Sequence, residues 1–156
     1  MTLEPLLRDH PFLKDLAPEH LALLAGCATN VRFGAGTFLF REGGAADRCF
    51  LIREGKIALE IAAPGHGAII VQTLAAGDVA GFSWLLEPHQ WQFDGRAVEP
   101  VHAFALDGTC LRGKCAEDPR LGFELTQLFA RLAIQRLQAT RLQLLDVYGN
   151  ASASAV

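Results

Sequence analysis

The sequence predicts a mostly β protein: a double-stranded β-helix (jelly roll) with flanking helices and one long helix at its C-terminal end. In residues 30–107, short apolar runs alternate with turns that contain glycine. Many short strands at this spacing are typical of a jelly roll or an antiparallel barrel. Between residues 57 and 62, isoleucine and leucine alternate with alanine and glutamate, a period of two that indicates a strand with one buried face. After Asp118 the apolar residues recur with a helical period. Pro119 is placed to open this helix, and no further proline interrupts it.

Length and composition favour one globular domain. The chain has 156 residues, of which 51% are hydrophobic and 20% charged, a balance that argues against disorder. A formal net charge of −3 does not favour binding to nucleic acid. The first twenty residues contain acids and prolines and no long apolar run, so we expect neither a signal peptide nor a membrane span, and a cytoplasmic location.

The chain divides into four expected segments. Residues 1–29 form a helical segment with two short helices, Leu3–Asp9 and Phe12–Cys27, in which Pro18 suits a first helical turn. Residues 30–116 form the jelly roll, and residues 117–148 form the long helix. The tail, residues 149–156, has no structural signal, and we expect it to be disordered.

The long helix is expected to dimerise. About thirty helical residues span roughly 45 Å, which is more than one small barrel covers. The simplest partner is the same helix of a second copy, joined along Pro119–Val147; packing of the helix wholly on its own barrel is the alternative. The predicted apolar stripe contains Leu121, Leu125, Leu128, Leu132 and Ala139–Leu142, and it is widened by Phe129, Leu137, Leu144 and Leu145.

Catalytic and metal chemistry find no support in the sequence. The five histidines lack the spacing of metal ligands, and Ser83 has no histidine and acid partner that can be named. We therefore expect a protein that is not an enzyme and holds no metal. Free thiols are the favoured interpretation of the scattered cysteines, and an iron–sulfur or redox role is the alternative. They are Cys27, Cys49, Cys110 and Cys115.

The chain resembles the cyclic-nucleotide-binding domain family, the sensor module of catabolite-activator-type and FNR-type regulators. The resemblance covers nearly the whole chain and rests on FGAGTFLFREGGAADRCFLIREGKIALEI, GDVAGFSWLLE and GRAVEPV. Its specific part is a set of glycines at the turns of the roll: Gly36, Gly43, Gly55, Gly77 and Gly81. Such glycines allow positive φ, so that a small barrel can close its corners.

The resemblance implies a phosphate-binding loop at Gly81, followed by a short helix from Phe82 or Ser83 whose N–H groups would face an anion. Family members place a glutamate for the ribose, an arginine for the cyclic phosphate and a Ser or Thr in this loop. The corresponding residues here are Phe82, Trp91 and Asp94. A charged hydrogen bond contributes about 1.5–3 kcal/mol, so we expect cyclic-nucleotide binding to be weak or absent.

Three features could still hold a ligand. Arg96 could replace the missing cation, although a surface position is the favoured interpretation. The backbone of Phe82, Ser83 and Trp84 could hold a weak anion. The aromatic cluster could line an apolar pocket, or its rings could fill the former cavity; it consists of Phe82, Trp84, Trp91 and Phe93.

The long helix adds a weaker signal for ligand binding. The resemblance implies that the residue at Thr140 and its successor Arg141 reach a base, partly across a dimer.

Two main functions follow. The first is a regulatory module that senses a ligand and acts through its dimerising helix. The residues with which such a module recognises a cyclic nucleotide are degenerate in this chain. The second is a protein-interaction module with a closed pocket and an unidentified protein partner. A transcription regulator is less favoured, because we expect no DNA-binding domain within this chain.

Overall fold

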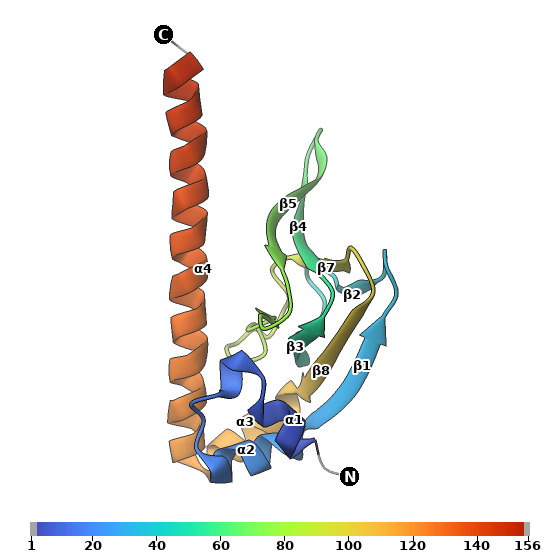
Figure 1. Cartoon of the computed structure of the whole chain (residues 1–156), viewed down its shortest axis with the longest axis vertical. Helices are drawn as coiled ribbons and strands as arrows, with labels where there is room; N and C mark the ends of the chain where they lie inside the picture. The colour runs from blue at the N-terminus through green and yellow to red at the C-terminus, as the bar shows by residue number, and fades with distance from the viewer. Residues whose placement is uncertain (1–2, 155–156) are drawn as a thin grey trace. The chain divides into compact units, whose positions relative to one another are not determined.

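The computed structural model describes the backbone of residues 3–154 and the side chains up to residue 149 (Figure 1). The chain forms two compact units, one up to Gly122 and one from Phe123 onward. The first unit contains two four-stranded antiparallel sheets, ordered β1-β8-β3-β6 and β2-β7-β4-β5. The strands are β1 Ala28–Phe33, β2 Phe38–Phe40, β3 Arg48–Glu54, β4 Ile57–Ala63, β5 Gly67–Leu74, β6 Val79–Ala80, β7 Asp94–Ala97 and β8 Val101–Asp107. This arrangement confirms the predicted jelly roll.

Helices precede and follow the two sheets in the sequence. They are α1 Glu4–Arg8, the 3₁₀ helix η1 Pro11–Leu13, α2 Pro18–Ala25, α3 Gly108–Glu117 and α4 Pro119–Ser154. Proline stands in the first turn of α1, η1 and α2, where its fixed φ favours a helix start. Figure 1 shows α1, α2 and α3 together at the end of the first sheet where β1 begins and β8 ends.

The helix α3 was not predicted. Its sequence, GTCLRGKCAE, buries only Gly108 and Leu111, so it has no apolar stripe that a periodicity search could detect. Its start is instead fixed by a cap, because the side chain of Asp107 accepts a hydrogen bond from the backbone N–H of Cys110 at 3.0 Å.

The core lies between the two sheets. It is built largely from aliphatic side chains of β2, β3, β4 and β8, with Phe40, Phe50 and Trp91 among them. The predicted alternation along β4 holds only in part, because Ala58 and Glu60 are buried together with Ile57 and Leu59. Glu60 is buried next to Arg96, whose Nε lies 2.5 Å from its carboxylate.

The expectation of four free thiols is wrong. Cys27 and Cys110 form a disulfide, whereas Cys49 and Cys115 are free. Cys27 directly precedes β1 and Cys110 follows β8, and these two strands pair with Ala28 opposite Leu106. The pairing brings together two cysteines that are 83 positions apart, a proximity that spacing along the sequence cannot reveal.

The helix α4 is longer than predicted. Its backbone is helical to Ser154, so residues 149–154 of the expected tail belong to it, and residues 155 and 156 lie outside the described residues. At 1.5 Å per residue, its 36 residues span about 54 Å. Across residues 3–154, no helix is both long and apolar enough to cross a membrane.

Gly55 is expected to be the turn glycine least tolerant of substitution. It has φ +94°, and a Cβ there would collide with the backbone carbonyl of Pro100 and lie 2.9 Å from Cα of Val101. Gly36 has a similar φ of +86° but nothing within 4 Å of the Cβ position. Gly36→Ala should therefore cost only the strain of positive φ, about 1–2 kcal/mol, whereas Gly55→Ala should cost roughly 3 kcal/mol or more.

Chemical denaturation of both variants measures this difference. An equal loss of unfolding free energy in the two proteins would contradict the packing described at Gly55.

Candidate functional site

The phosphate-loop glycine lies against a tryptophan ring. Gly81 has φ +96°, and a Cβ at this position would lie 2.5 Å from Cζ3 and 2.6 Å from Cη2 of Trp91. The indole therefore occupies the space that a glycine at this position would open for a ligand. Trp91 is only 6% exposed.

Trp91 belongs to an aromatic stack that runs through the interior of the roll. Its ring is stacked on Phe40, with centroids 4.0 Å apart and planes 14° apart. Phe40 is in turn stacked on Phe50 at 6.3 Å, and Phe50 meets the edge of Phe33 at 5.7 Å. Gly95, on β7, accommodates the Phe40 ring, which a Cβ at that position would strike. The Trp91 ring thus packs in the core, on rings from outside the predicted aromatic cluster.

The backbone around Trp91 is held by the loop after β2. Gly43 donates to the Trp91 carbonyl at 2.8 Å, and the Trp91 N–H donates to Gly44 at 2.9 Å. The N–H of Ala46 donates to the carbonyl of His89 at 2.7 Å. These hydrogen bonds hold the backbone of His89 and Trp91 against the loop after β2, and they thereby position the indole ring in the roll.

The expected helix after Gly81 is replaced by turns. Residues 83–88 form turns and bends, with one bond from the N–H of Leu85 to the Phe82 carbonyl at 3.2 Å. The expectation that a helix starts at Phe82 or Ser83 is therefore wrong. Without a helix, the aligned N–H groups and the dipole that would attract an anion are not formed.

The aromatic residues of the loop do not line one pocket. Trp84 is fully buried beside α3, where Arg112 donates to its carbonyl at 2.6 Å and a Cβ on Gly108 would lie 3.0 Å from its Cβ. Phe82 and Ser83 line a separate outer groove of about 180 Å³, together with Leu86, Glu87, Pro88, His89, Gln90 and Gln92. Phe93 is half-buried.

Asp94 and Arg96, the two charged residues of β7, are paired with other partners. Asp94 Oδ1 accepts the N–H of Glu42 at 2.8 Å and lies 3.4 Å from Nε of Arg41. Arg96 pairs with Glu60. Arg96 and Glu60 alternate along β7 and β4 with the core residues Ala97 and Leu59, so this ion pair lies on the sheet face opposite the core, and Arg96 does not replace the missing cation.

Thr140 and Arg141 lie in the second unit and are exposed. The hydroxyl of Thr140 donates to the carbonyl of Arg136 one helical turn earlier, at 2.9 Å. The hydrogen-bonding capacity of Thr140 is thus partly used within its own helix.

The residues present do not fit a cyclic nucleotide bound in the manner of the family. The resemblance places Phe82 and Trp91 at the positions of the acid and the arginine, and the Trp91 ring fills the space at Gly81. A phosphate placed there would meet an aromatic face in place of charged donors, and its desolvation would go uncompensated.

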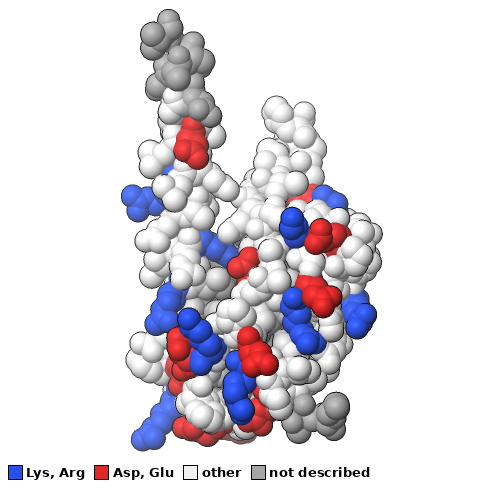
Figure 2. Space-filling view, viewed as in Figure 1, with Lys and Arg blue, Asp and Glu red and all other residues white. Residues whose placement is uncertain are grey.

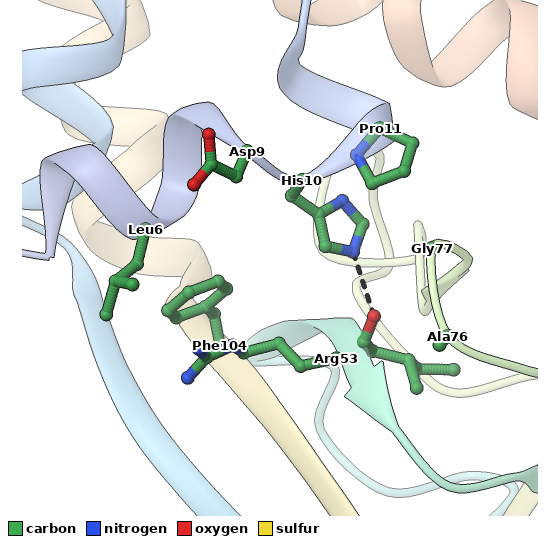
Figure 3. A pocket seen from close by; sticks show the side chains of 9 residues that line it. Leu6, Asp9, His10, Pro11, Arg53, Ala76, Gly77 and Phe104 are labelled. Atoms are coloured by element: carbon green, nitrogen blue, oxygen red, sulfur yellow. Dashed lines mark hydrogen bonds between the residues drawn. The ribbon is translucent and has the colours of Figure 1, made fainter.

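A second cavity, of about 340 Å³, lies between the N-terminal segment and the first sheet (Figure 3). His10 forms part of its wall and is 5% exposed. Its Nδ1 accepts the N–H of Phe12 at 3.2 Å, so Nε2 carries the proton and donates to the carbonyl of Ile52 at 3.0 Å. Sequence spacing could not reveal this histidine, because its role is to join η1 to β3.

Charge is mixed on the molecular surface. On the face shown in Figure 2, basic and acidic side chains alternate over the first unit and do not separate into patches. Throughout the part of the chain whose side chains are described, no group of three or more His, Cys, Asp or Glu residues is placed to hold a metal ion.

The stability of the fold should depend on the protonation of His10. Burial is the main cause that lowers its pKa; Arg53 lowers it further, while the Ile52 carbonyl and Asp78 oppose the shift. The unfolded state therefore binds the proton more readily, and stability should fall as pH drops below about 6.5 towards the lowered pKa. His10→Gln should lose stability at pH 7.5, and its deficit relative to the wild type should shrink at pH 5.

Thermal unfolding of both proteins between pH 7.5 and 5 tests this expectation, with His66→Gln, at an exposed turn, as the control. A deficit of His10→Gln that is the same at every pH would contradict the neutral, buried state of His10.

Comparisons with known proteins agree with the fold. A CRP-like cAMP-activated global transcriptional regulator of Mycobacterium tuberculosis is 24% identical over 145 residues; the match covers 93% of this chain and 63% of that protein. The chain therefore spans less than two thirds of the length of this relative.

Two solved structures show the same fold. A cyclic nucleotide-binding domain from Methylobacillus flagellatus has a TM-score of 0.82 at 18% identity, covering 93% of this chain and 85% of that one. The catabolite activator protein of Thermus thermophilus has a TM-score of 0.67 at 24% identity, covering 87% of this chain and 63% of that one.

The family model described as the cyclic nucleotide-binding domain matches residues 30–118, which is more than half of the chain and includes both sheets. The turn glycines, the paired sheets and this match agree, and the chain belongs to the cyclic nucleotide-binding domain family.

Proposed function

We propose that this chain is a regulatory module whose interior is closed to cyclic nucleotides and which acts by interacting with proteins, first of all a second copy of itself. The observation that carries the proposal is the contact of the Trp91 ring with Gly81. It favours the second of the two functions inferred from the sequence.

The energetic argument has two parts. Losing the arginine–phosphate contact removes about 1.5–3 kcal/mol. In addition, a ligand must first displace Trp91, and the loss of a buried aromatic side chain costs roughly 3–5 kcal/mol. Because each 1.4 kcal/mol is a factor of ten, displacement alone weakens binding by roughly two to four powers of ten.

Ligand sensing remains the competing function, and the mycobacterial relative described as cAMP-activated favours it. This function requires Trp91 to leave the interior when a ligand binds. Such a movement would expose the Phe40 ring and break the backbone bonds to Gly43 and Gly44. Any ligand would have to supply the free energy of that rearrangement.

Restoring the two family side chains should restore cyclic-nucleotide binding. Titration calorimetry with cyclic AMP and cyclic GMP should detect no binding by the unmodified protein. The double variant Phe82→Glu plus Trp91→Arg should bind with a Kd below about 1 mM, because one charge-assisted pair returns and the ring is gone. Asp94 is left unchanged, since it holds Glu42 and Arg41.

The control is Trp91→Ala, which opens the space without supplying charge and should bind at least tenfold more weakly than the double variant. Thermal unfolding of the unmodified protein with millimolar cyclic nucleotide gives a second measurement that needs no variant. A clear upward shift in Tm, or a micromolar Kd, would contradict the closed interior.

The second copy is proposed to bind along α4. Residues 123, 127, 130, 134, 137, 141, 144 and 148 are all exposed and follow one another at alternating steps of four and three. This is the spacing of a coiled-coil seam. The large apolar residues at these positions are Phe123, Ile134, Leu137, Leu144 and Tyr148, with exposures of 55–67%.

This seam shares Leu137 and Leu144 with the stripe predicted from the sequence but leaves out Leu128 and Leu132. Leu128 and Leu132 are half-buried in the single chain, whereas Leu137 and Leu144 are exposed. Arg141 lies on the seam between them, and a single charged residue at such a position sets register at some cost in stability.

Two negatively charged side chains introduced on the α4 seam should prevent dimer formation. Light scattering at tens of micromolar should give twice the chain mass of 16.9 kDa for the unmodified protein and a single chain for Leu137→Asp plus Leu144→Asp. The control is Gln138→Glu, an exposed position off the seam, which should leave the dimer intact. A single-chain mass for the unmodified protein would contradict the proposal.

A further inference from the structure

The disulfide joins the N-terminal segment to α3. Cys27 follows α2, and Cys110 lies in the first turn of α3. Alongside it, Lys114 donates to the carbonyl of Leu23 at 2.6 Å, and the N–H of Asp107 donates to the Cys27 carbonyl at 2.9 Å. The covalent bond holds this junction together with these two bonds and with the pair of His20 on α2 and Asp118 after α3, whose Nε2 and Oδ2 lie 3.7 Å apart.

A cavity of about 260 Å³ opens beside the disulfide. It is lined by Gly26, Cys27, Ala28, Thr29, Arg48, Ala105, Asp107 and Cys110. Cys27 is 6% exposed, whereas Cys110 is half-buried. A small molecule in this cavity thus meets the bond from the Cys110 side without unfolding of the domain.

We propose that this cavity is a thiol–disulfide exchange site, at which a small thiol bearing a carboxylate opens the Cys27–Cys110 bond through a mixed disulfide on Cys110. The proposal is independent of whether the roll interior binds a nucleotide.

The exchange takes place in two balanced steps. The thiolate of the small molecule attacks Sγ of Cys110; the new S–S bond forms there, and Cys27 leaves as a thiolate that takes up a proton. A second small thiolate then attacks the small-molecule sulfur of the mixed disulfide, and Cys110 leaves as a thiolate. The protein disulfide is reduced by two electrons, and two small thiols are oxidised to one disulfide.

The position of Cys110 favours the second step. Cys110 is the third residue of α3, near the end where the helix dipole stabilises a thiolate, while its own N–H is donated to the carboxylate of Asp107. A stabilised thiolate leaves more readily and stabilises the reduced form.

Arg48 supplies the recognition of a carboxylate. It lines the cavity, and its side chain is 43% exposed. Its contacts are a long ion pair with Asp47, 3.9 Å from Nε, and the Phe50 ring at 5.1 Å, which leave guanidinium donors for a carboxylate. The other charged groups near the cavity are already engaged, Asp107 as the cap of α3 and Lys114 at the end of α2.

The other two cysteines are poor competitors for exchange. Cys49 is fully buried, and burial raises its pKa well above the usual value. The pKa of Cys115 is also raised, first by burial and then by the neighbouring carboxylate of Asp118. Few molecules of either would be thiolates at neutral pH.

The test measures the opening of the disulfide in the full-length, air-oxidised protein by reduced glutathione and by neutral 2-mercaptoethanol. Samples are quenched by alkylation and mapped by mass spectrometry. We expect a transient glutathione adduct on Cys110 and none on Cys49. Arg48→Gln should slow opening by glutathione about three- to tenfold and change opening by 2-mercaptoethanol less than twofold, and the matched control Arg32→Gln should change neither.

Reduction should also lower Tm by about 10 °C, because a long loop is freed in the unfolded state. The double variant Cys27→Ser plus Cys110→Ser should match the reduced protein and show no response to thiols. Free Cys27 and Cys110 in the air-oxidised protein, or opening only in denaturant, would overturn the exchange site. An equal effect of Arg48→Gln on both thiols would overturn the recognition of a carboxylate.

Discussion

The packing of one indole against one glycine determines what the interior of this jelly roll can do. Trp91 enters the roll at Gly81, stacks on Phe40 and joins the core that both sheets share. A glycine with positive φ leaves room for a ligand near the backbone. In this protein the Trp91 ring fills that room at Gly81. Gly95 serves the same arrangement, because its missing side chain leaves space for the Phe40 ring.

The polar side chains next to the expected nucleotide site make structural contacts in this protein. Asp94 ties the start of β7 to the loop after β2, and Arg96 pairs with Glu60 on the sheet face away from the core. Residues after Gly81 form turns and therefore present no helix start to an anion. For a domain with this interior we propose regulation through two outer surfaces, the seam of α4 and the junction of α2 with α3.

The jelly roll was predictable because its turns depend on local chemistry. Glycines at 36, 43, 55, 77 and 81 all adopt positive φ, and that requirement can be inferred from the sequence alone. The disulfide was not predictable, because the meeting of Cys27 and Cys110 depends on the pairing of β1 with β8. The same holds for His10, whose hydrogen bond to Ile52 spans 42 positions. The resemblance predicted that Trp91 stands in place of an arginine, but only the structure shows which space the ring fills.

The position of the Trp91 ring in solution tests the central claim most directly. The chain contains two tryptophans, so fluorine labelling of tryptophan gives two resonances, and Trp91→Phe assigns one of them. A filled interior predicts that the Trp91 resonance is protected from solvent and unchanged by millimolar cyclic AMP. A saturable shift of this resonance towards a solvent-exposed position on addition of cyclic AMP would contradict it.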